Sequence, residues 1–342
     1  TTLRAIILKE PGQFSFTEKE DVKAEKNKAI VKIKRIGICG TDYHAYKGNQ
    51  PFFSYPRVLG HELGGEIISI SEGDIQHDLK VGDKVAVEPY LNCGKCQACE
   101  SGHINCCEAI SVIGVHSDGG MAEYISIPLN KIHKSDTLSF DQLALVETLG
   151  IGLHAVNRAN IHTGEKVLII GAGPIGLGVA QFSKLKGAVV CMADISESRL
   201  GFIEKLGLSD SSIQVAGKLE EATLREALGG DLPSVVIDAT GNKNSMLNTF
   251  NVVAHGGRLV FVGLFQGDVT FFDPNFHKRE LTLLASRNCL PDDFKEIISL
   301  IEQGVIDTNP WLSHRTSFED MPDKFDSFLE PSQEVIKAII EL

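Results

Sequence analysis

The sequence has no apolar stretch long enough to cross a membrane. Its longest uncharged run, from Val167 up to Lys184, is interrupted by glycine and proline, as in nucleotide-binding loops rather than membrane spans. The apolar run near the N-terminus ends at Lys9 and lacks the cleavage pattern of a signal peptide. We therefore expect a cytoplasmic protein with no membrane partner.

The chain also lacks an excess of positive charge. Its 33 lysines and arginines are outnumbered by 45 acidic residues, for a net charge of −12. A non-specific nucleic-acid binder needs a basic face, so we expect no nucleic-acid partner. Aromatic residues are sparse at 7%, but the hydrophobic and charged fractions are ordinary for a globular protein, and 342 residues suffice for two domains.

Cysteine is unevenly placed, with five of eight cysteines between positions 93 and 107. In a reducing compartment, clustered thiols indicate a metal site more often than disulfides or an iron–sulfur cluster. Cys93, Cys96, Cys99 and Cys107 have the spacing C-x2-C-x2-C-x7-C, which can close a tetrahedron around one Zn²⁺. Such a site is saturated, so we expect a structural zinc. Cys106 is an alternative fourth ligand.

The hydrophobic pattern predicts an α/β protein with two kinds of domain. Residues 28–38, 63–73 and 81–90 alternate apolar and polar side chains, which indicates short antiparallel strands in a barrel or sandwich. From about residue 140, helical patterns alternate with apolar strands, which is typical of a doubly wound parallel sheet. The six expected parallel strands span residues 166–170, 189–193, 212–215, 235–238, 258–262 and 281–285.

A glycine-rich loop follows the first of these parallel strands. Gly171, Gly173 and Gly176 form a G-x-G-x-x-G pattern that includes Pro174 and Ile175 and opens a helix. The glycines allow a tight turn, close approach of a pyrophosphate and close helix–strand packing, while the helix N-terminus faces the phosphates. The loop therefore predicts a dinucleotide site.

The next strand ends at Asp194, where a carboxylate can accept hydrogen bonds from the adenosine ribose. Because that carboxylate would repel a 2′-phosphate, we expect NAD rather than NADP. Arg199, five residues further on, could partly compensate this repulsion.

Two further glycine-flanked segments contain possible metal ligands. Cys39 lies in one, and His61 and Glu62 lie in the other. Each is unremarkable alone, because a single cysteine usually packs as a small apolar residue. Together with the cysteine cluster and the dinucleotide loop, they suggest a second, catalytic zinc.

With these motifs, the chain resembles the zinc-dependent medium-chain dehydrogenases, the alcohol and polyol dehydrogenase superfamily. The segments GICGTDYH, GHELGGEI, VGDKVAV, the cysteine quartet, ETLGIGLHAV and the glycine loop carry the resemblance over essentially the whole chain. It implies a GroES-like β-barrel catalytic domain over residues 1–147, a Rossmann cofactor domain over 148–286, and a return to the catalytic domain over 287–342.

The resemblance implies roles for single residues. Cys39 and His61 match ligands of the catalytic zinc, and Glu62 matches an adjacent carboxylate that binds zinc in the polyol branch. Glu147 matches a carboxylate that binds zinc directly or through water, although Thr148 stands where that branch usually has proline.

In the same way, Thr41 matches the hydroxyl that bonds the substrate oxygen and His44 the exposed end of a proton relay. Asp42 matches a partner of the zinc-bound histidine. Further cofactor contacts are implied for Thr240, Val262, Leu264 and Arg287.

Within the superfamily, GNQPFFSYPRVLGHE and VGLFQGDVTFFDPNFHKRE resemble bacterial hexonate dehydrogenases. This implies oxidation of a secondary alcohol of a sugar acid or polyol, such as L-galactonate, to the ketone. The alternatives are a hexitol, threonine or a simple alcohol as substrate, a zinc-free reductase of quinone type, and a non-catalytic sensor of NAD and zinc. Candidate selectivity residues are Phe52, Phe53, His116, Phe265 and Arg287.

Two further expectations concern the surface. Members of this superfamily are commonly dimers or tetramers, so we expect a homodimer or homotetramer, in which a strand within residues 258–265 could pair across subunits. The histidines in polar contexts, His133 among them, are interpreted as surface residues.

Overall fold

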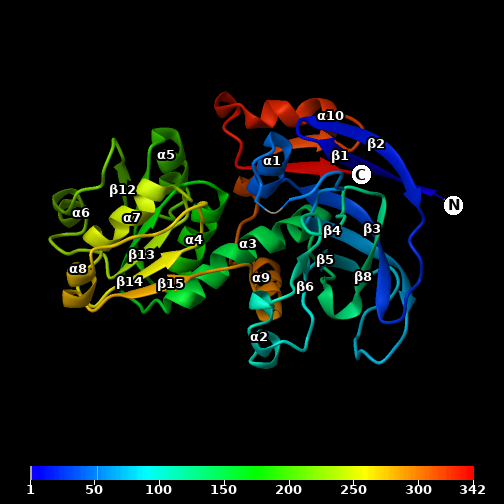
Figure 1. Cartoon of the computed structure of the whole chain (residues 1–342), viewed down its shortest axis with the longest axis horizontal. Helices are drawn as coiled ribbons and strands as arrows, with labels where there is room; N and C mark the ends of the chain where they lie inside the picture. Colours follow the sequence, from blue (N-terminus) through cyan, green and yellow to red (C-terminus); the bar gives the residue numbers. More distant parts are fainter. Residues whose placement is uncertain (1, 52) are drawn as a thin grey trace. The chain divides into compact units, whose positions relative to one another are not determined.

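The computed structural model describes residues 2–51 and 53–342, so Phe52 lies outside the described residues. The chain divides into two compact units. One, here called the split unit, combines the chain up to Thr148 with Cys289–Leu342; the other, the central unit, comprises Leu149–Asn288. In Figure 1 the blue start and red end of the chain belong to the split unit, and the green and yellow middle forms the central unit. No helix among the described residues has the length and apolar character needed to span a bilayer.

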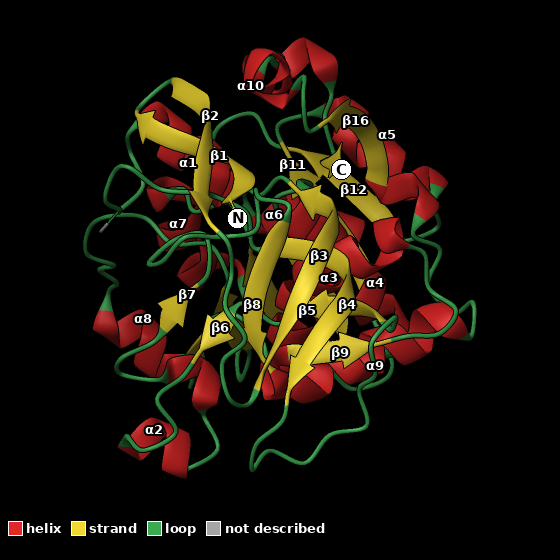
Figure 2. Cartoon of the chain, turned by 90° about the vertical axis from the view of Figure 1, so that its right-hand side faces the viewer, coloured by secondary structure: helices red, strands yellow, loops and turns green. Residues whose placement is uncertain are grey.

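The split unit is built on a seven-stranded sheet in the order β16-β17-β3-β4-β5-β9, with β8 paired to β3. Most pairings are antiparallel, and Figure 2 shows β3, β4, β5 and β8 side by side. Side chains of β3 alternate between buried and half-buried, which explains the period-two pattern in its sequence. The strands are β3 (Lys28–Gly37), β4 (Glu62–Ser71), β5 (Lys84–Val87), β8 (Tyr124–Pro128), β9 (Ile132–Lys134), β16 (Leu312–Ser317) and β17 (Lys337–Glu341).

Two small ribbons and several short helices complete this unit. The ribbons pair β1 (Thr2–Glu10) with β2 (Gln13–Glu20), and β6 (Tyr90–Leu91) with β7 (Ser111–Val112). The helix α3 (Phe140–Ala159) begins in the split unit and continues beyond Thr148. The other α-helices are α1 (Gly40–Lys47), α2 (Gln97–Glu100), α9 (Pro291–Glu302) and α10 (Met321–Lys324), and the 3₁₀ helices are Ile104–Cys106, Leu129–Lys131, Asn309–Trp311, Phe325–Leu329 and Pro331–Gln333.

The central unit contains a parallel sheet in the order β12-β11-β10-β13-β14-β15. A helix connects each strand to the next, and the order is that of a doubly wound sheet, as predicted. The strands are β10 (Lys166–Ile170), β11 (Val189–Asp194), β12 (Ser211–Gln214), β13 (Val235–Asp238), β14 (Arg258–Phe261) and β15 (Thr282–Ala285). The connecting helices are α4 (Pro174–Leu185), α5 (Glu197–Lys205), α6 (Glu221–Ala227), α7 (Lys243–Val252) and α8 (Asp273–Lys278).

The sheet order corrects one expectation about subunit pairing. The strand expected to pair across subunits is β14, but β14 is hydrogen-bonded to β13 on one side and β15 on the other. Its backbone groups are therefore already used within the chain. The free edge on this side of the sheet belongs to β15.

Candidate active site and metal centres

Cys39, His61 and Glu62 come together in the split unit. One ligand atom from each lies within 4.8 Å of the others. Cys39 is the residue before α1, and its backbone N–H donates to the Asp42 carboxylate over 2.9 Å, which fixes the start of the helix. Glu62 is the first residue of β4 and lies opposite Gly37 of β3 in the sheet register.

The turn that carries His61 is fixed by its backbone. The N–H groups of Gly119 and Gly120 donate to the carbonyls of Val58 and Gly60 over 2.7 and 2.8 Å. A Cβ atom on Gly119 would lie 2.3 Å from the Gly60 carbonyl oxygen, so a larger residue there would push the two segments apart. This close contact holds His61 beside Cys39.

Several buried polar atoms at this site have no hydrogen-bond partner among the described residues. They are His61 Nδ1, Glu62 Oε2, Glu147 Oε2 and Thr41 Oγ1. Asp42 Oδ1 lies 3.9 Å from His61 Nδ1, which is too far for a hydrogen bond. Because an unsatisfied buried polar group is costly, such a cluster points to a missing ligand. Thiolate, imidazole and carboxylate are the ligands that zinc prefers, so these residues fit a zinc ion.

Glu147 lies on α3 close to this group but outside the three residues that come within ligand distance of one another. Its Oε1 accepts a hydrogen bond from the buried hydroxyl of Tyr90, which leaves Oε2 without a partner in the described chain. Burial, reinforced by the nearby Cys289 and Glu147, raises the pKa of Tyr90 well above its ordinary value, so the phenol is the donor.

A buried lysine that the sequence analysis did not identify completes the site. Lys337 Nζ donates to Glu62 Oε1 over 2.9 Å and to the Ile38 carbonyl over 3.0 Å, and Lys337 is only 3% exposed. Gly37 has no side chain where a Cβ would meet Glu62 Oε2 at 2.1 Å, which leaves room for the carboxylate. The available signal was a lysine within a mostly apolar strand, VIKAIIEL.

The local charges shift several pKa values. Burial lowers the pKa of His61, but the adjacent Cys39, Asp42 and Glu147 outweigh it and raise the pKa well above 6.5. Burial raises the pKa of both Asp42 and Glu147, and the nearby His61 opposes each rise. The charge states of His61, Cys39, Asp42 and Glu147 therefore depend on one another. A bound cation would lower the energy of the negatively charged groups among them.

Thr41 and His44 lie on α1, one helical turn apart, and therefore share a face of that helix. The Thr41 hydroxyl is buried, whereas His44 is exposed and its Nδ1 lies 3.1 Å from Asn49 Oδ1. The helix thus has a hydroxyl at its inner end and an imidazole at the solvent.

The four cysteines of the C-x2-C-x2-C-x7-C pattern also lie together, with each pair of sulfurs within 4.8 Å. Backbone N–H groups point at the sulfurs: Cys93 donates to Cys107 Sγ over 3.2 Å, and Cys96 donates to Cys93 Sγ over 3.3 Å. Hydrogen bonds from backbone amides, that of Cys99 foremost, lower the pKa of Cys96 to about 6. The group contains Cys107, whereas Cys106 is exposed and outside it. These thiols fit a second zinc.

The glycine loop of the central unit links β10 to α4. Gly171 has φ +105°, and a Cβ on Gly176 would lie 1.7 Å from the Gly171 carbonyl oxygen, so no larger residue fits there without moving the helix. Pro174 is the first residue of α4, where its missing N–H costs nothing. The carboxylate of Asp194 accepts the N–H groups of Ala172 and Ser196, each over 2.7 Å.

A pocket of about 960 Å³ lies at the carboxyl ends of these strands. Gly171, Gly173, Asp194, Arg199 and Thr240 line it, as the dinucleotide hypothesis requires. Other expected cofactor residues are absent from its lining: Pro174, Ile175, Gly176, Val262, Leu264 and Arg287. Several other polar and apolar residues that line the pocket were not predicted from the sequence, including Val215, Lys218, Leu219, Asn242 and Asn248.

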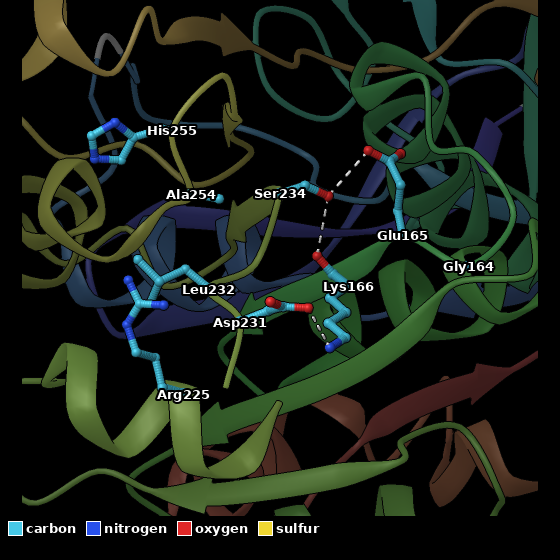
Figure 3. A pocket seen from close by; sticks show the side chains of 9 residues that line it. All are labelled: Gly164, Glu165, Lys166, Arg225, Asp231, Leu232, Ser234, Ala254 and His255. Carbon is cyan, nitrogen blue, oxygen red and sulfur yellow. Dashed lines mark hydrogen bonds and ion pairs between the residues drawn. The ribbon is translucent and has the colours of Figure 1, made fainter. Parts of the chain in front are cut away.

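A second pocket, of about 460 Å³, lies at the opposite, amino ends of the strands (Figure 3). Lys166 pairs there with Asp231 over 2.7 Å, and the Ser234 hydroxyl donates to Glu165 over 3.1 Å. Glu165 is paired with Arg258 and Arg225 with Glu221, so the charged side chains named here already have ion-pair partners within the chain.

The residues expected to set substrate selectivity, and the histidines expected at the surface, lie in several different parts of the structure. The Phe53 ring packs against Tyr55, His116 accepts the Val112 N–H, and Arg287 is exposed on the central unit. The prediction that His133 lies at the surface is wrong. It is buried, lies 2.9 Å from Glu88 and stacks on Phe294.

Comparison with known proteins places this geometry in a family. Residues 25–137 match the alcohol dehydrogenase GroES-like domain, and residues 174–303 match the zinc-binding dehydrogenase domain. The chain is 46% identical to the L-galactonate-5-dehydrogenase of Escherichia coli K12 over 343 residues, which covers 99% of each chain.

Solved structures of dehydrogenases agree with this family assignment. An alcohol dehydrogenase of E. coli CFT073 (rspB), solved with the cofactor NADH, superposes with a TM-score of 0.93 at 28% identity, over 100% of both chains. The L-idonate 5-dehydrogenase of E. coli K-12 gives a TM-score of 0.90 at 25% identity, over 100% of this chain and 99% of that one. The predicted GroES-like and Rossmann fold is confirmed, and the chain belongs to the zinc-binding alcohol dehydrogenases.

Proposed function

We propose that this protein is a zinc- and NAD-dependent dehydrogenase that oxidises a secondary alcohol of a sugar acid to the ketone. L-galactonate is the first candidate substrate, because of the 46% identity over nearly the whole chain to an L-galactonate-5-dehydrogenase. The observation that carries the proposal is the cluster of Cys39, His61 and Glu62, whose ligand atoms lie within 4.8 Å of one another. A cysteine, a histidine and a carboxylate are three protein ligands, the number typical of catalytic zinc sites, which keep a further position for substrate or water.

The bound groups supply the chemistry that side chains lack: zinc makes a hydroxyl proton easier to remove, and NAD accepts a hydride. The chain's own residues do the remainder. Cys39, His61 and Glu62 would hold the metal, while Lys337 orients Glu62 through its hydrogen bond to Oε1. The Thr41 hydroxyl, which has no partner among the described residues, would accept the substrate proton as it gives up its own, and that proton would leave to solvent by way of His44 at the exposed end of α1.

In the central unit, the glycine loop and the N-terminus of α4 would receive the pyrophosphate of NAD. Asp194 lines the same pocket and would accept the ribose hydroxyls. A 2′-phosphate would meet this carboxylate, and so NAD is favoured over NADP.

The test is an NADH-formation screen with L-galactonate, L-idonate, hexitols, threonine and simple alcohols, applied to the wild type and to Cys39→Ala. We expect turnover on a hexonate that chelation removes and added zinc restores. Cys39→Ala should lose this turnover, while Cys106→Ser, which changes an exposed cysteine outside both groups, should retain it.

Three outcomes would contradict the proposal. Turnover by Cys39→Ala at the wild-type rate would remove the metal cluster from the reaction. Oxidation of threonine or ethanol with no hexonate turned over would move the protein to another substrate class. Binding of NAD and zinc with no turnover of any alcohol would indicate a sensor.

We also propose a homodimer or homotetramer, with β15 as the pairing edge. Its outer side lacks a strand partner in the described chain, and Leu283 on it is 37% exposed. An unpaired edge strand is a template for a second copy. Sedimentation velocity should show an assembly that Leu283→Lys weakens; a monomer at micromolar concentration would oppose this.

A further inference from the structure

Only one of the two carboxylate oxygens of Glu147 has a hydrogen-bond partner among the described residues. Its carboxylate belongs to a residue that is 5% exposed, and Oε1 accepts the Tyr90 hydroxyl, while Oε2 is buried without a partner in the described chain. A buried carboxylate normally uses both oxygens. One oxygen is therefore committed to the protein, and the other remains available to a ligand.

Tyr90 has a fixed position in the fold. It is 2% exposed and belongs to β6, where it pairs with Val112 of β7. The backbone N–H of Ile113 donates to the Pro89 carbonyl over 2.9 Å and closes the ribbon. The thiol of Cys289, itself 1% exposed, lies 4.0 Å from the Tyr90 oxygen on another side. The phenol thus has little freedom to move away from Glu147.

The same ribbon is the base of the cysteine quartet. β6 ends at Leu91, two residues before Cys93, and β7 begins at Ser111, four residues after Cys107. The segment that holds the four thiols therefore leaves and returns through the two strands that place Tyr90.

We propose that Tyr90 is a positioning residue: it fixes Glu147 through Oε1 and thereby presents Oε2 to the metal at Cys39 and His61, or to a water on that metal. The inference rests on the proposed zinc site. It gives the cysteine-quartet segment a role at the catalytic centre, because the strands at its base hold the phenol.

The test replaces Tyr90 by Phe, which removes one oxygen and keeps the ring. Loss of a residue that orients a metal-binding group typically costs 10–100-fold in metal affinity or activity. We expect Tyr90→Phe to lower zinc affinity in a chelator competition, or kcat with the KM for NAD unchanged, by about that factor. The visible spectrum of the cobalt-substituted enzyme should also shift. Affinity and spectrum need no substrate, so a wrong sugar-acid assignment would leave this test intact.

A double-mutant cycle tests whether Tyr90 affects the metal site through Glu147. If Tyr90 acts through Glu147, then Tyr90→Phe combined with Glu147→Gln should be no worse than Glu147→Gln alone. The matched control is Tyr124→Phe, which removes a phenol oxygen from β8 of the same unit and should leave metal affinity and spectrum unchanged.

Rescue distinguishes positioning from packing. With 4-aminophenylalanine at position 90, an N–H donor returns and the wild-type spectrum should return with it, whereas 4-methylphenylalanine fills the same volume without a donor and should behave like Tyr90→Phe. This pair also applies if Tyr90→Phe fails to fold. Wild-type metal affinity and spectrum in Tyr90→Phe, effects that add in the double variant, or equal behaviour of the two analogues would each overturn the proposal.

Discussion

Lys337 shows how a single residue near the end of the chain can hold a carboxylate of the proposed metal site in place. The ion pair with Glu62 is almost fully buried, with side-chain exposures of 3% and 0%. Burial lowers the pKa of Lys337, but the negative charges of Glu62 and Cys39 outweigh this effect and raise the pKa overall. The lysine therefore stays charged. Glu62 and Lys337 therefore depend on each other for charge compensation.

We predict that Lys337→Met destabilises the protein by about 3–5 kcal/mol, because it leaves an uncompensated buried carboxylate. Urea unfolding measures this. The double variant Lys337→Met with Glu62→Gln should recover much of the loss, since neither charge remains. Equal stability of Lys337→Met and wild type would show that Glu62 finds another partner.

A second prediction at this scale concerns cofactor choice. Asp194→Asn should lower kcat/KM for NAD by about tenfold to a hundredfold, because hydrogen bonds to a charged group contribute about 1.5–3 kcal/mol. The variant should also use NADP relatively better. Asp210→Asn is the control, since Asp210 accepts the Val190 N–H outside the pocket lining and should leave the ratio of the two cofactors unchanged.

At the scale of elements, the strands of the central unit could be predicted from the sequence, whereas the shortest strands of the split unit could not. Strands β10 to β15 could be predicted within one or two residues, because each is a short apolar run between turn residues. The two-residue ribbon of β6 and β7 could not, since it has too few residues for a periodic pattern.

We predict that Gly176→Ala abolishes or strongly weakens NAD binding, because the new methyl would lie 1.7 Å from the Gly171 carbonyl oxygen and displace the loop. The matched control is Gly201→Ala in α5, where nothing lies within 4 Å of the added atom. This control should bind NAD normally and gain up to about 1 kcal/mol of stability from better helix propensity. Fluorescence titration with NAD and thermal unfolding would compare the two; identical NAD affinities would contradict the steric argument.

At the scale of the whole molecule, the split unit must join two distant parts of the sequence. The strand β17 pairs with β3, and Asp141 at the start of α3 binds both Arg35 of β3 and Arg315 of β16. These contacts join the C-terminal segment Cys289–Leu342 to the part of the unit that precedes Leu149.

Acid stability should report on this junction. Hydrogen bonds from Arg315 and then Arg35 hold the pKa of Asp141 below its ordinary value, although burial opposes them. The stabilisation is therefore fully present above about pH 4 and is lost as the pH falls through the lowered pKa of the folded state. We predict that Asp141→Asn costs about 1 kcal/mol at neutral pH and flattens the acid limb of the stability curve. An unaltered acid limb in Asp141→Asn would place the acid sensitivity elsewhere.

The sequence by itself determined the features that depend on short spacing. The four thiols lie within fifteen residues, and the glycine loop within six, so the chain between them leaves few alternative geometries. Only the tertiary structure decided which distant groups meet. Lys337 reaches Glu62 across 275 residues, and Tyr90 reaches Glu147 across 57. Both contacts follow from sheet register and helix placement, which local patterns do not encode, because pairing of distant strands is set by burial over the whole unit.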